Sequence, residues 1–244
     1  MLVGKFAEFF YFCSRYSEET DVIMPTMIEK IRELPLFMGI SPESIQLILE
    51  KLPLHFHNAE AGETVIRKGE QIEVLSFVIS GSLKVEGEIE RGRITVCQWV
   101  GEGCMLFPDF LFGYERRAPM SVVAAEKCGL LCVSKQLLVE LISADRYCLV
   151  NLLNDLSYKA QARLQFGEDA ADNEPLARLL RHILVNLTYR RARRIEIVAK
   201  DYDLQAILGI GPGELAESLE RLRREKKIEY YGDVISINCR KEYF

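Results

Sequence analysis

Histidine is scarce in this 244-residue sequence, and the scarcity limits the metal chemistry that it can support. His55 and His57 are near each other, whereas His182 stands far away in the sequence. A cupin-like metal enzyme needs two or three histidines and a carboxylate around one ion. The sequence also has no nucleophile elbow, phosphate-cradling glycine loop or metalloprotease motif. We therefore expect no catalytic residues, no metal ligands and no cofactor.

Long apolar runs and paired cysteines are missing as well. No run approaches the roughly 20 apolar residues that span a bilayer. The N-terminal stretch carries Lys5 and Glu8 and has no clear cleavage site, which argues against a signal peptide. The seven cysteines are odd in number and scattered, so they do not form a disulfide framework. These features predict a cytoplasmic protein with reduced thiols and no membrane partner.

The chain lacks an overall positive charge, but its charge is unevenly distributed. The formal net charge is −5. From Glu174 to the end there are 14 Lys and Arg against 11 Asp and Glu, and before it there are 17 against 25. The densest basic runs are Tyr189–Arg194 and Arg221–Lys227. Either run can be a solvated helix end, where cations offset the helix dipole. Phosphate contact is favoured for the second run, because it closes a candidate recognition helix.

The segment Asp203–Lys227 predicts two short helices joined by a glycine turn that begins at Gly209. The second helix carries leucines at i, i+4 and i+7, which share one face: Leu215, Leu219 and Leu222. A β-hairpin over residues 227–238 follows, with glycine in its turn. This order predicts a winged helix, whose second helix can enter a DNA major groove. An ordinary helical hairpin is the alternative.

Short β-rich segments alternate with glycines over residues 55–134, a texture typical of a barrel or sandwich. The expected strands are Thr64–Ile66, Leu75–Ile79, Ser82–Val85, Ile94–Cys97, Met120–Ala124 and Gly129–Val133. Two short helical patterns precede them, at Met27–Ile31 and Ser41–Leu49.

An apolar stripe at three- and four-residue spacing predicts a long helix after Ser134. Its members are Leu149, Leu152, Leu153, Leu156, Ala160 and Leu164. The stripe could pack on the barrel, but its length favours a coiled-coil dimer seam. A break at Gly167–Asn173 follows, and another helix is expected with Pro175 in its first turn.

A small β-barrel, a long helix and a winged helix, in this order, resemble the cyclic-AMP receptor/Fnr (Crp/Fnr) superfamily of bacterial transcription regulators. The resemblance spans roughly residues 25–240. It is carried by Pro35–Phe37, by Ala61–Glu70, by Phe77–Leu83 and by the helix-turn-helix spacing around Gly209.

The resemblance implies an α+β fold with four parts. These are an N-terminal extension at 1–24, a cyclic-nucleotide-binding-like sensor barrel at 25–143, a dimerisation helix and hinge at 144–170, and a winged helix-turn-helix at 171–244. Residues 1–23 precede the usual start of the family, so Met24 is a candidate initiator.

The expected ligand cassette, Gly103–Pro119, departs from the family pattern. Cyclic-nucleotide-binding members have a Gly-Glu pair that holds the ribose, and an Arg followed by Ser or Thr that holds the phosphate. Phe107 and Pro108 take the Gly-Glu positions here. Arg117 can fill the arginine position, but Ala118 follows it and offers no hydroxyl. The resemblance therefore implies an effector other than cyclic AMP, or none.

The site residues implied by the resemblance fall into two groups. The ligand candidates are Phe107, Asp109, Arg116 and Arg117. The DNA candidates are Gln205, Gly211, Gly213, Glu214, Glu217, Arg221, Arg223, Arg224 and Lys226. The implied partners are a near-palindromic DNA operator, a second copy of the chain, RNA polymerase and an unidentified small-molecule effector.

The candidate recognition helix also departs from the family. Pro212, Gly213 and Glu217 stand where the family places Arg, Glu and Arg. Carboxylates on this helix repel phosphates unless they accept a hydrogen bond from cytosine N4. Two functions stay open: a DNA-binding regulator, and a dimeric interaction protein with a vestigial sensor that no longer reads a DNA sequence.

Overall fold

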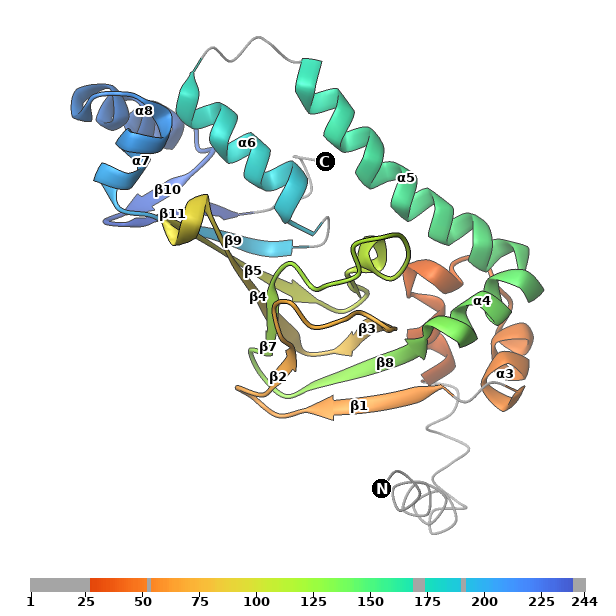
Figure 1. Ribbon diagram of the computed structural model, residues 1–244. Coiled ribbons are helices and arrows are strands. Elements are labelled where there is room, and N and C mark those ends of the chain that lie inside the picture. Colours follow the sequence, from red (N-terminus) through yellow and green to blue (C-terminus); the bar gives the residue numbers. More distant parts are fainter. Residues whose placement is uncertain (1–26, 52–53, 169–173, 190–191, 239–244) are drawn as a thin grey trace.

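The computed structural model describes residues 27–51, 54–168, 174–189 and 192–238, which form a mixed α+β structure (Figure 1). The expected N-terminal extension therefore lies outside the described residues. We call residues 27–144 the N-terminal unit and residues 174–238 the C-terminal unit. The long helix α5 (Arg146–Glu168) lies between them in the chain.

The N-terminal unit begins with a helical segment at 27–32, the 3₁₀ turn η1 (Pro35–Phe37) and helix α3 (Pro42–Lys51). Its strands are β1 (His55–Ala59), β2 (Thr64–Ile66), β3 (Val74–Ser80), β4 (Ser82–Ile89), β5 (Ile94–Gly101), β6 (Met105–Leu106), β7 (Ser121–Ala124) and β8 (Cys128–Ser134). Short turns η2 (Glu90–Gly92) and η3 (Pro108–Phe110) interrupt them, and helix α4 (Lys135–Ala144) ends the unit.

These strands form two sheets whose pairings are antiparallel. One sheet has the order β1-β8-β3-β6. The other has the order β10-β11-β9-β5-β4-β7-β2, and it includes strands of the C-terminal unit. The described strands do not close into a barrel, so the expected barrel is wrong in that detail. The inward-facing residues of both sheets, such as Phe77, Val85 and Leu131, are fully buried and make one core.

The C-terminal unit contains helix α6 (Pro175–Leu187), strand β9 (Ala192–Val198), helices α7 (Asp201–Leu208) and α8 (Pro212–Arg224), and strands β10 (Glu229–Tyr231) and β11 (Val234–Asn238). Gly209 ends α7 in the left-handed region (φ 66°), which a glycine enters without a steric cost. Strands β10 and β11 form the expected hairpin. Strand β9 lies in the part of the chain that the sequence patterns left without an element.

Helix α5 is anchored at its start to the N-terminal unit. Asn151 donates its side-chain amide to the carbonyls of Leu36 (3.1 Å) and Met38 (2.8 Å). Leu152 is only 5% exposed, so it belongs to the core of its own chain, whereas the adjacent Leu153 is 51% exposed. Helix α5 thus presents one apolar face inward and leaves another uncovered. No helix among the described residues is long and apolar enough to cross a membrane.

Gly81, in the tight turn between β3 and β4, provides a test of this packing. Its φ is +79°, and an added Cβ would lie 2.5 Å from the Lys127 carbonyl oxygen. Gly62 has a similar φ of +84°, but a Cβ there would meet no atom within 4 Å. We expect Gly62→Ala to cost about 1 kcal/mol from backbone strain alone. Gly81→Ala should cost about 2 kcal/mol more, because overlap with the backbone adds to the strain.

Urea unfolding of the two variants measures this difference. Equal losses in the free energy of unfolding would show that the turn does not pack against Lys127 as described.

Candidate functional site

The candidate site is built around the start of η3, where the cassette segment meets the C-terminal unit. Phe107 precedes η3 and adopts a left-handed backbone conformation (φ 47°, ψ 45°). This conformation costs a residue with a Cβ roughly 1–2 kcal/mol relative to glycine. A glycine would adopt this conformation without that cost. The Phe107 side chain is 4% exposed and packs edge-on against Phe110, with ring centroids 6.2 Å apart.

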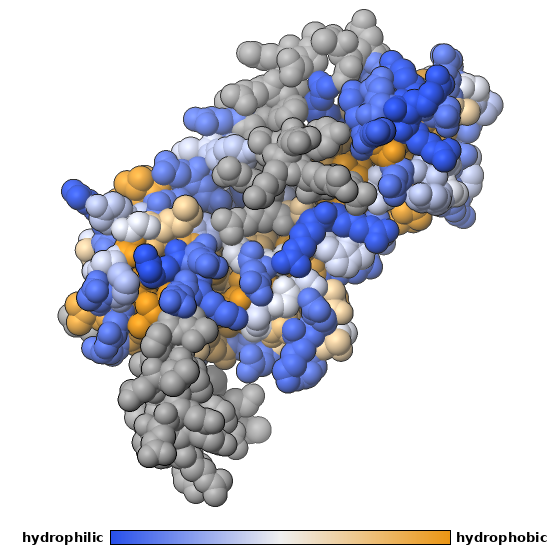
Figure 2. All heavy atoms as spheres, turned by 180° about the vertical axis from the view of Figure 1, so that it is seen from behind, coloured by the Kyte–Doolittle hydropathy of each residue, from blue (hydrophilic) through white to orange (hydrophobic). Residues whose placement is uncertain are grey.

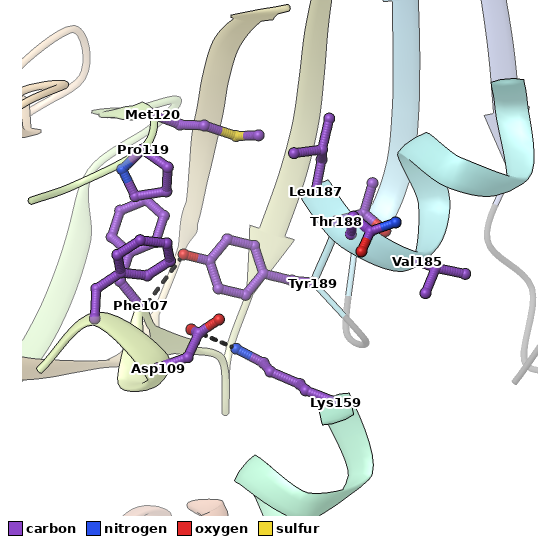
Figure 3. A pocket seen from close by; sticks show the side chains of 11 residues that line it. Phe107, Asp109, Pro119, Met120, Lys159, Val185, Leu187, Thr188 and Tyr189 are labelled. Atoms are coloured by element: carbon purple, nitrogen blue, oxygen red, sulfur yellow. Dashed lines mark hydrogen bonds and ion pairs between the residues drawn. The ribbon is translucent and has the colours of Figure 1, made fainter. Parts of the chain in front are cut away.

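Tyr189, just beyond α6, inserts its side chain into this cassette (Figure 3). Its ring centroid lies 5.7 Å from that of Phe107, and its hydroxyl accepts a hydrogen bond from the Phe107 backbone N–H at 3.2 Å. Tyr189 is 7% exposed. Burial raises the pKa of its phenol well above the usual value, so the hydroxyl stays neutral.

Gln98, on β5, holds the backbone around Tyr189. Its side-chain amide is fully buried. Its Oε1 accepts from the Tyr189 N–H (2.7 Å), and its Nε2 donates to the Leu187 carbonyl (2.8 Å). The two bonds satisfy backbone groups that the end of α6 would otherwise leave buried without partners.

An ion pair closes one side of the site. Lys159 of α5 lies 3.0 Å from Asp109 of η3, with both side chains roughly one fifth exposed. The Lys159 ammonium also lies 5.6 Å from the centroid of the Tyr189 ring. These contacts join the cassette, the long helix and the C-terminal unit at one place.

A cavity of about 100 Å³ remains beside these groups. Its lining comes from the cassette segment, from Lys159 and from the end of α6 and the residues after it: Phe107, Asp109, Phe110, Pro119, Met120, Lys159, Val185, Asn186, Leu187, Thr188 and Tyr189. This volume is below the roughly 300–1,000 Å³ of a pocket for a drug-sized ligand. Tyr189 forms part of the wall of this small cavity.

The structure brings only part of the predicted ligand set together. Phe107 and Asp109 line the cavity, whereas Arg116 and Arg117 are not among its lining residues. Arg117 is exposed and donates from its guanidinium to the Gly69 carbonyl at 2.9 Å.

Tyr189, Lys159 and Gln98 escaped the sequence reasoning, because nothing in the local pattern links three segments so far apart in the chain. No cluster of three or more His, Cys, Asp or Glu side chains suited to a metal ion occurs in the described part of the chain.

The predicted DNA residues lie on α7, α8 and the turn between them. Glu217 of α8 is exposed. Glu214 instead accepts from the Gly211 N–H at 2.9 Å, which caps the start of α8. Arg221 forms an ion pair with Glu174 at the start of α6. Hydrophilic residues gather at the end of the molecule formed by α7 and α8 (Figure 2).

Arg223 and Arg224 each lie near Glu220, with nitrogen–oxygen distances of 3.7 and 3.6 Å, and keep more than half of their side chains exposed. Lys226, Gln205 and Gly213 complete the set; Lys226 and Gly213 are exposed, and Gln205 is half-buried.

Of the predicted dimer residues, three are exposed on α5: Leu149, Leu153 and Ala160. Leu156 is half-buried and packs against the core. Leu152 is buried within its own chain. The side chain of Leu164 lies outside the described residues.

Comparison with known proteins finds a family match within the N-terminal part of the chain. Residues 56–145 match the cyclic nucleotide-binding domain family. No curated protein sequence matches the chain.

Three solved structures illustrate the likeness. The sensor domain of the transcriptional regulator DNR from Pseudomonas aeruginosa is 19% identical, with 59% of this chain and 94% of that chain covered and a TM-score of 0.50. Catabolite activator protein from Thermus thermophilus is 20% identical (84% and 93% covered, TM-score 0.47). The c-di-GMP-responsive regulator CLP from Xanthomonas campestris is 18% identical (82% and 100% covered, TM-score 0.48). These matches agree with the resemblance suggested by the sequence, and the likeness to the DNR sensor domain shows a shared fold.

The cassette geometry predicts that the protein does not bind cyclic AMP specifically. Phe107 and Pro108 offer no acceptor for ribose hydroxyls, and Tyr189 fills the space beside them. Each polar group of the nucleotide that loses its partner costs on the order of 1–3 kcal/mol. Isothermal titration calorimetry should therefore detect no saturable heat with cyclic AMP at micromolar protein. A micromolar dissociation constant that Arg117→Ala abolishes would contradict this account of the cassette.

Proposed function

We propose that this protein is a homodimeric, DNA-binding transcription regulator of the Crp/Fnr type, with an effector other than cyclic AMP, and that it is not an enzyme. The observation that carries the proposal is the arrangement after α6. Helices α7 and α8 meet at a turn of three residues, and the β10–β11 hairpin follows. This is the order of a winged helix-turn-helix, on the same chain as a cyclic nucleotide-binding domain.

The side chains of α8 support its role as the recognition helix. Leu215, Leu219 and Leu222 are buried, so the opposite face is free to meet a partner. That face ends in basic residues, which suits phosphate contact at one end of a groove-binding helix. Glu217 is the best-placed candidate reader of a base, because Glu214 is engaged in the cap of α8.

The uncovered face of α5 supports dimer formation. Leu149, Val150 and Leu153 are 38%, 50% and 51% exposed. They lie within one helical face, and pairing two such helices would bury them as a coiled-coil seam.

A dimeric interaction protein is the second candidate, and the ion pairs of α8 favour it. Arg221 is paired with Glu174, and both Arg223 and Arg224 lie near Glu220. Carboxylates beside these cations offset part of the positive charge that a phosphate would meet.

Dimerisation can be tested at Leu153. We expect the wild-type protein to be a dimer at micromolar concentration and Leu153→Glu to be a folded monomer, because a charge in the seam has no partner. Leu47 has nearly the same exposure, 50%, and is on a different helix, α3. Leu47→Glu should therefore stay dimeric by light scattering. A monomeric wild-type protein, or a dimeric Leu153→Glu variant, would contradict the proposed dimer seam on α5.

DNA reading can be tested by selecting bound duplexes from a random pool at low salt, with and without cell extract as a source of effector. We expect an enriched, near-palindromic motif whose half-sites are about one helical turn, roughly 34 Å, apart. Arg224→Ala should weaken binding on all sequences and reduce its salt dependence, because a phosphate contact carries no sequence information. Glu217→Ala should change the preferred sequence instead.

Arg67→Ala in the N-terminal unit is the matched control and should bind normally. If no motif emerges under either condition, the regulator proposal fails and the interaction protein is the better account.

A further inference from the structure

The C-terminal unit is joined to the N-terminal unit by strand pairing. Strand β9 pairs antiparallel with β5, in a register that runs from Thr95 opposite Val198 to Trp99 opposite Arg194. One sheet therefore runs from the hairpin of the C-terminal unit to β2 of the N-terminal unit (Figure 1). Backbone hydrogen bonds of this kind fix both the position and the orientation of the C-terminal unit.

Tyr189 lies just before β9 in the chain, and its side chain enters the cassette. The cassette contacts this side chain on several sides, as a binding site contacts its ligand. The ring lies on Phe107, and the hydroxyl accepts from the Phe107 backbone N–H. Gln98 fixes the backbone on the other side, and Lys159 lies over the ring. Figure 3 shows the phenol pointing from the end of α6 toward the cassette. An aromatic surface with one polar anchor is the usual chemistry of a small-molecule site.

We propose that Tyr189 is an intramolecular ligand of the cassette pocket, which accepts a phenol ring, and that its insertion latches the protein in a closed state with β9 paired to β5. A molecule that occupies the Tyr189 position must displace the tyrosine and thereby weaken the latch. Ligand binding to the pocket and pairing of β9 with β5 are then coupled, because the ligand and Tyr189 cannot occupy the same space.

The closed state binds DNA weakly, a step that rests on the function proposed above. Pairing turns two cations of the C-terminal unit toward the N-terminal unit. The Arg193 guanidinium covers Gly101 so closely that a Cβ there would overlap it. Arg194 lies 5.5 Å from the Trp99 ring centroid and pairs with Glu196. Both arginines remain exposed, but their guanidinium groups lie against Gly101 and the Trp99 ring, so a phosphate contact competes with this packing while β9 is paired with β5.

The register supplies a direct probe of closure. Cys97 stands opposite Glu196, so Glu196→Cys creates a pair of thiols across the two strands. Directly opposed residues have Cα atoms about 4.5–5.5 Å apart, within the range that a disulfide spans. Diamide, which takes up the two electrons and two protons, should join Cys97 to the introduced thiol in a disulfide, identified as a linked peptide by mass spectrometry. The Cys97→Ser, Glu196→Cys double variant is the control and should not form it.

The rate of this cross-link then measures the latch. In the Glu196→Cys background, Tyr189→Ala should slow cross-linking at least tenfold, and Tyr189→Phe, which keeps the ring, should slow it less. Tyr202→Ala, at a tyrosine that is 62% exposed, should leave the rate unchanged. Millimolar p-cresol, which corresponds to the tyrosine side chain, should bind the emptied pocket of the Tyr189→Ala variant. It should show no saturable binding to the Tyr202→Ala variant, in which Tyr189 still fills the pocket.

Saturable p-cresol binding by calorimetry supports the pocket, and its absence overturns the statement that the pocket accepts a phenol. Failure of Glu196→Cys to cross-link, or an unchanged rate in Tyr189→Ala, overturns the latch.

The DNA step has its own readout, using a duplex from the selection. We expect the oxidised Glu196→Cys protein to bind at least tenfold more weakly than the reduced protein, with affinity restored by dithiothreitol. Equal affinities would overturn the statement that the closed state binds DNA weakly. The latch itself would still be decided by the cross-linking rates. Failure of every variant to select a duplex would count against the regulator proposal instead, since the cross-link and the p-cresol titration need no DNA.

Discussion

The arrangement of the two units depends on the pairing of β5 with β9, and Gln98 of β5 adds side-chain hydrogen bonds to it. A polar side chain that is fully buried must find hydrogen-bond partners, because an unpaired buried amide costs on the order of 1–3 kcal/mol. Gln98 finds them on Leu187 and Tyr189, in the short link between α6 and β9. The glutamine therefore has both of its backbone partners only while the C-terminal unit is docked. If the C-terminal unit moves away, Gln98 loses these two hydrogen-bond partners. The stability of the core and the position of the C-terminal unit are therefore energetically linked.

The cassette couples its neighbours in the same way. Residues 56–145 match a domain family named for cyclic nucleotides, yet the cassette holds Phe107 in a glycine-like backbone conformation and receives a tyrosine from its own chain. Aromatic contacts offset the strain at Phe107, and the Lys159–Asp109 ion pair ties α5 to the same place. A structural change at the cassette therefore alters contacts with both the long helix and the C-terminal unit.

Much of the fold followed from local sequence patterns. Glycines separated the strands, the leucine spacing of α8 marked its buried face, and Gly209 ended α7 as expected. The site was less accessible, because Gln98, Lys159 and Tyr189 meet only through tertiary contacts. Strand β9 was overlooked because its first arginines resembled a solvated helix end, although Ile195 and Ile197 alternate as a half-buried strand does. The apolar stripe of α5 likewise combined two faces: Leu152 packs inward, and Leu153 faces outward.

Amide hydrogen exchange of the wild-type protein tests the shared sheet most directly, because it reads the β5–β9 hydrogen bonds without a variant, a ligand or DNA. If one sheet joins the two units, the amides of β9 and β5 that face each other should be protected as strongly as those between β4 and β5. Amides of β9 that face β5 and exchange as fast as an exposed sheet edge, while the β9–β11 amides stay protected, would contradict the account.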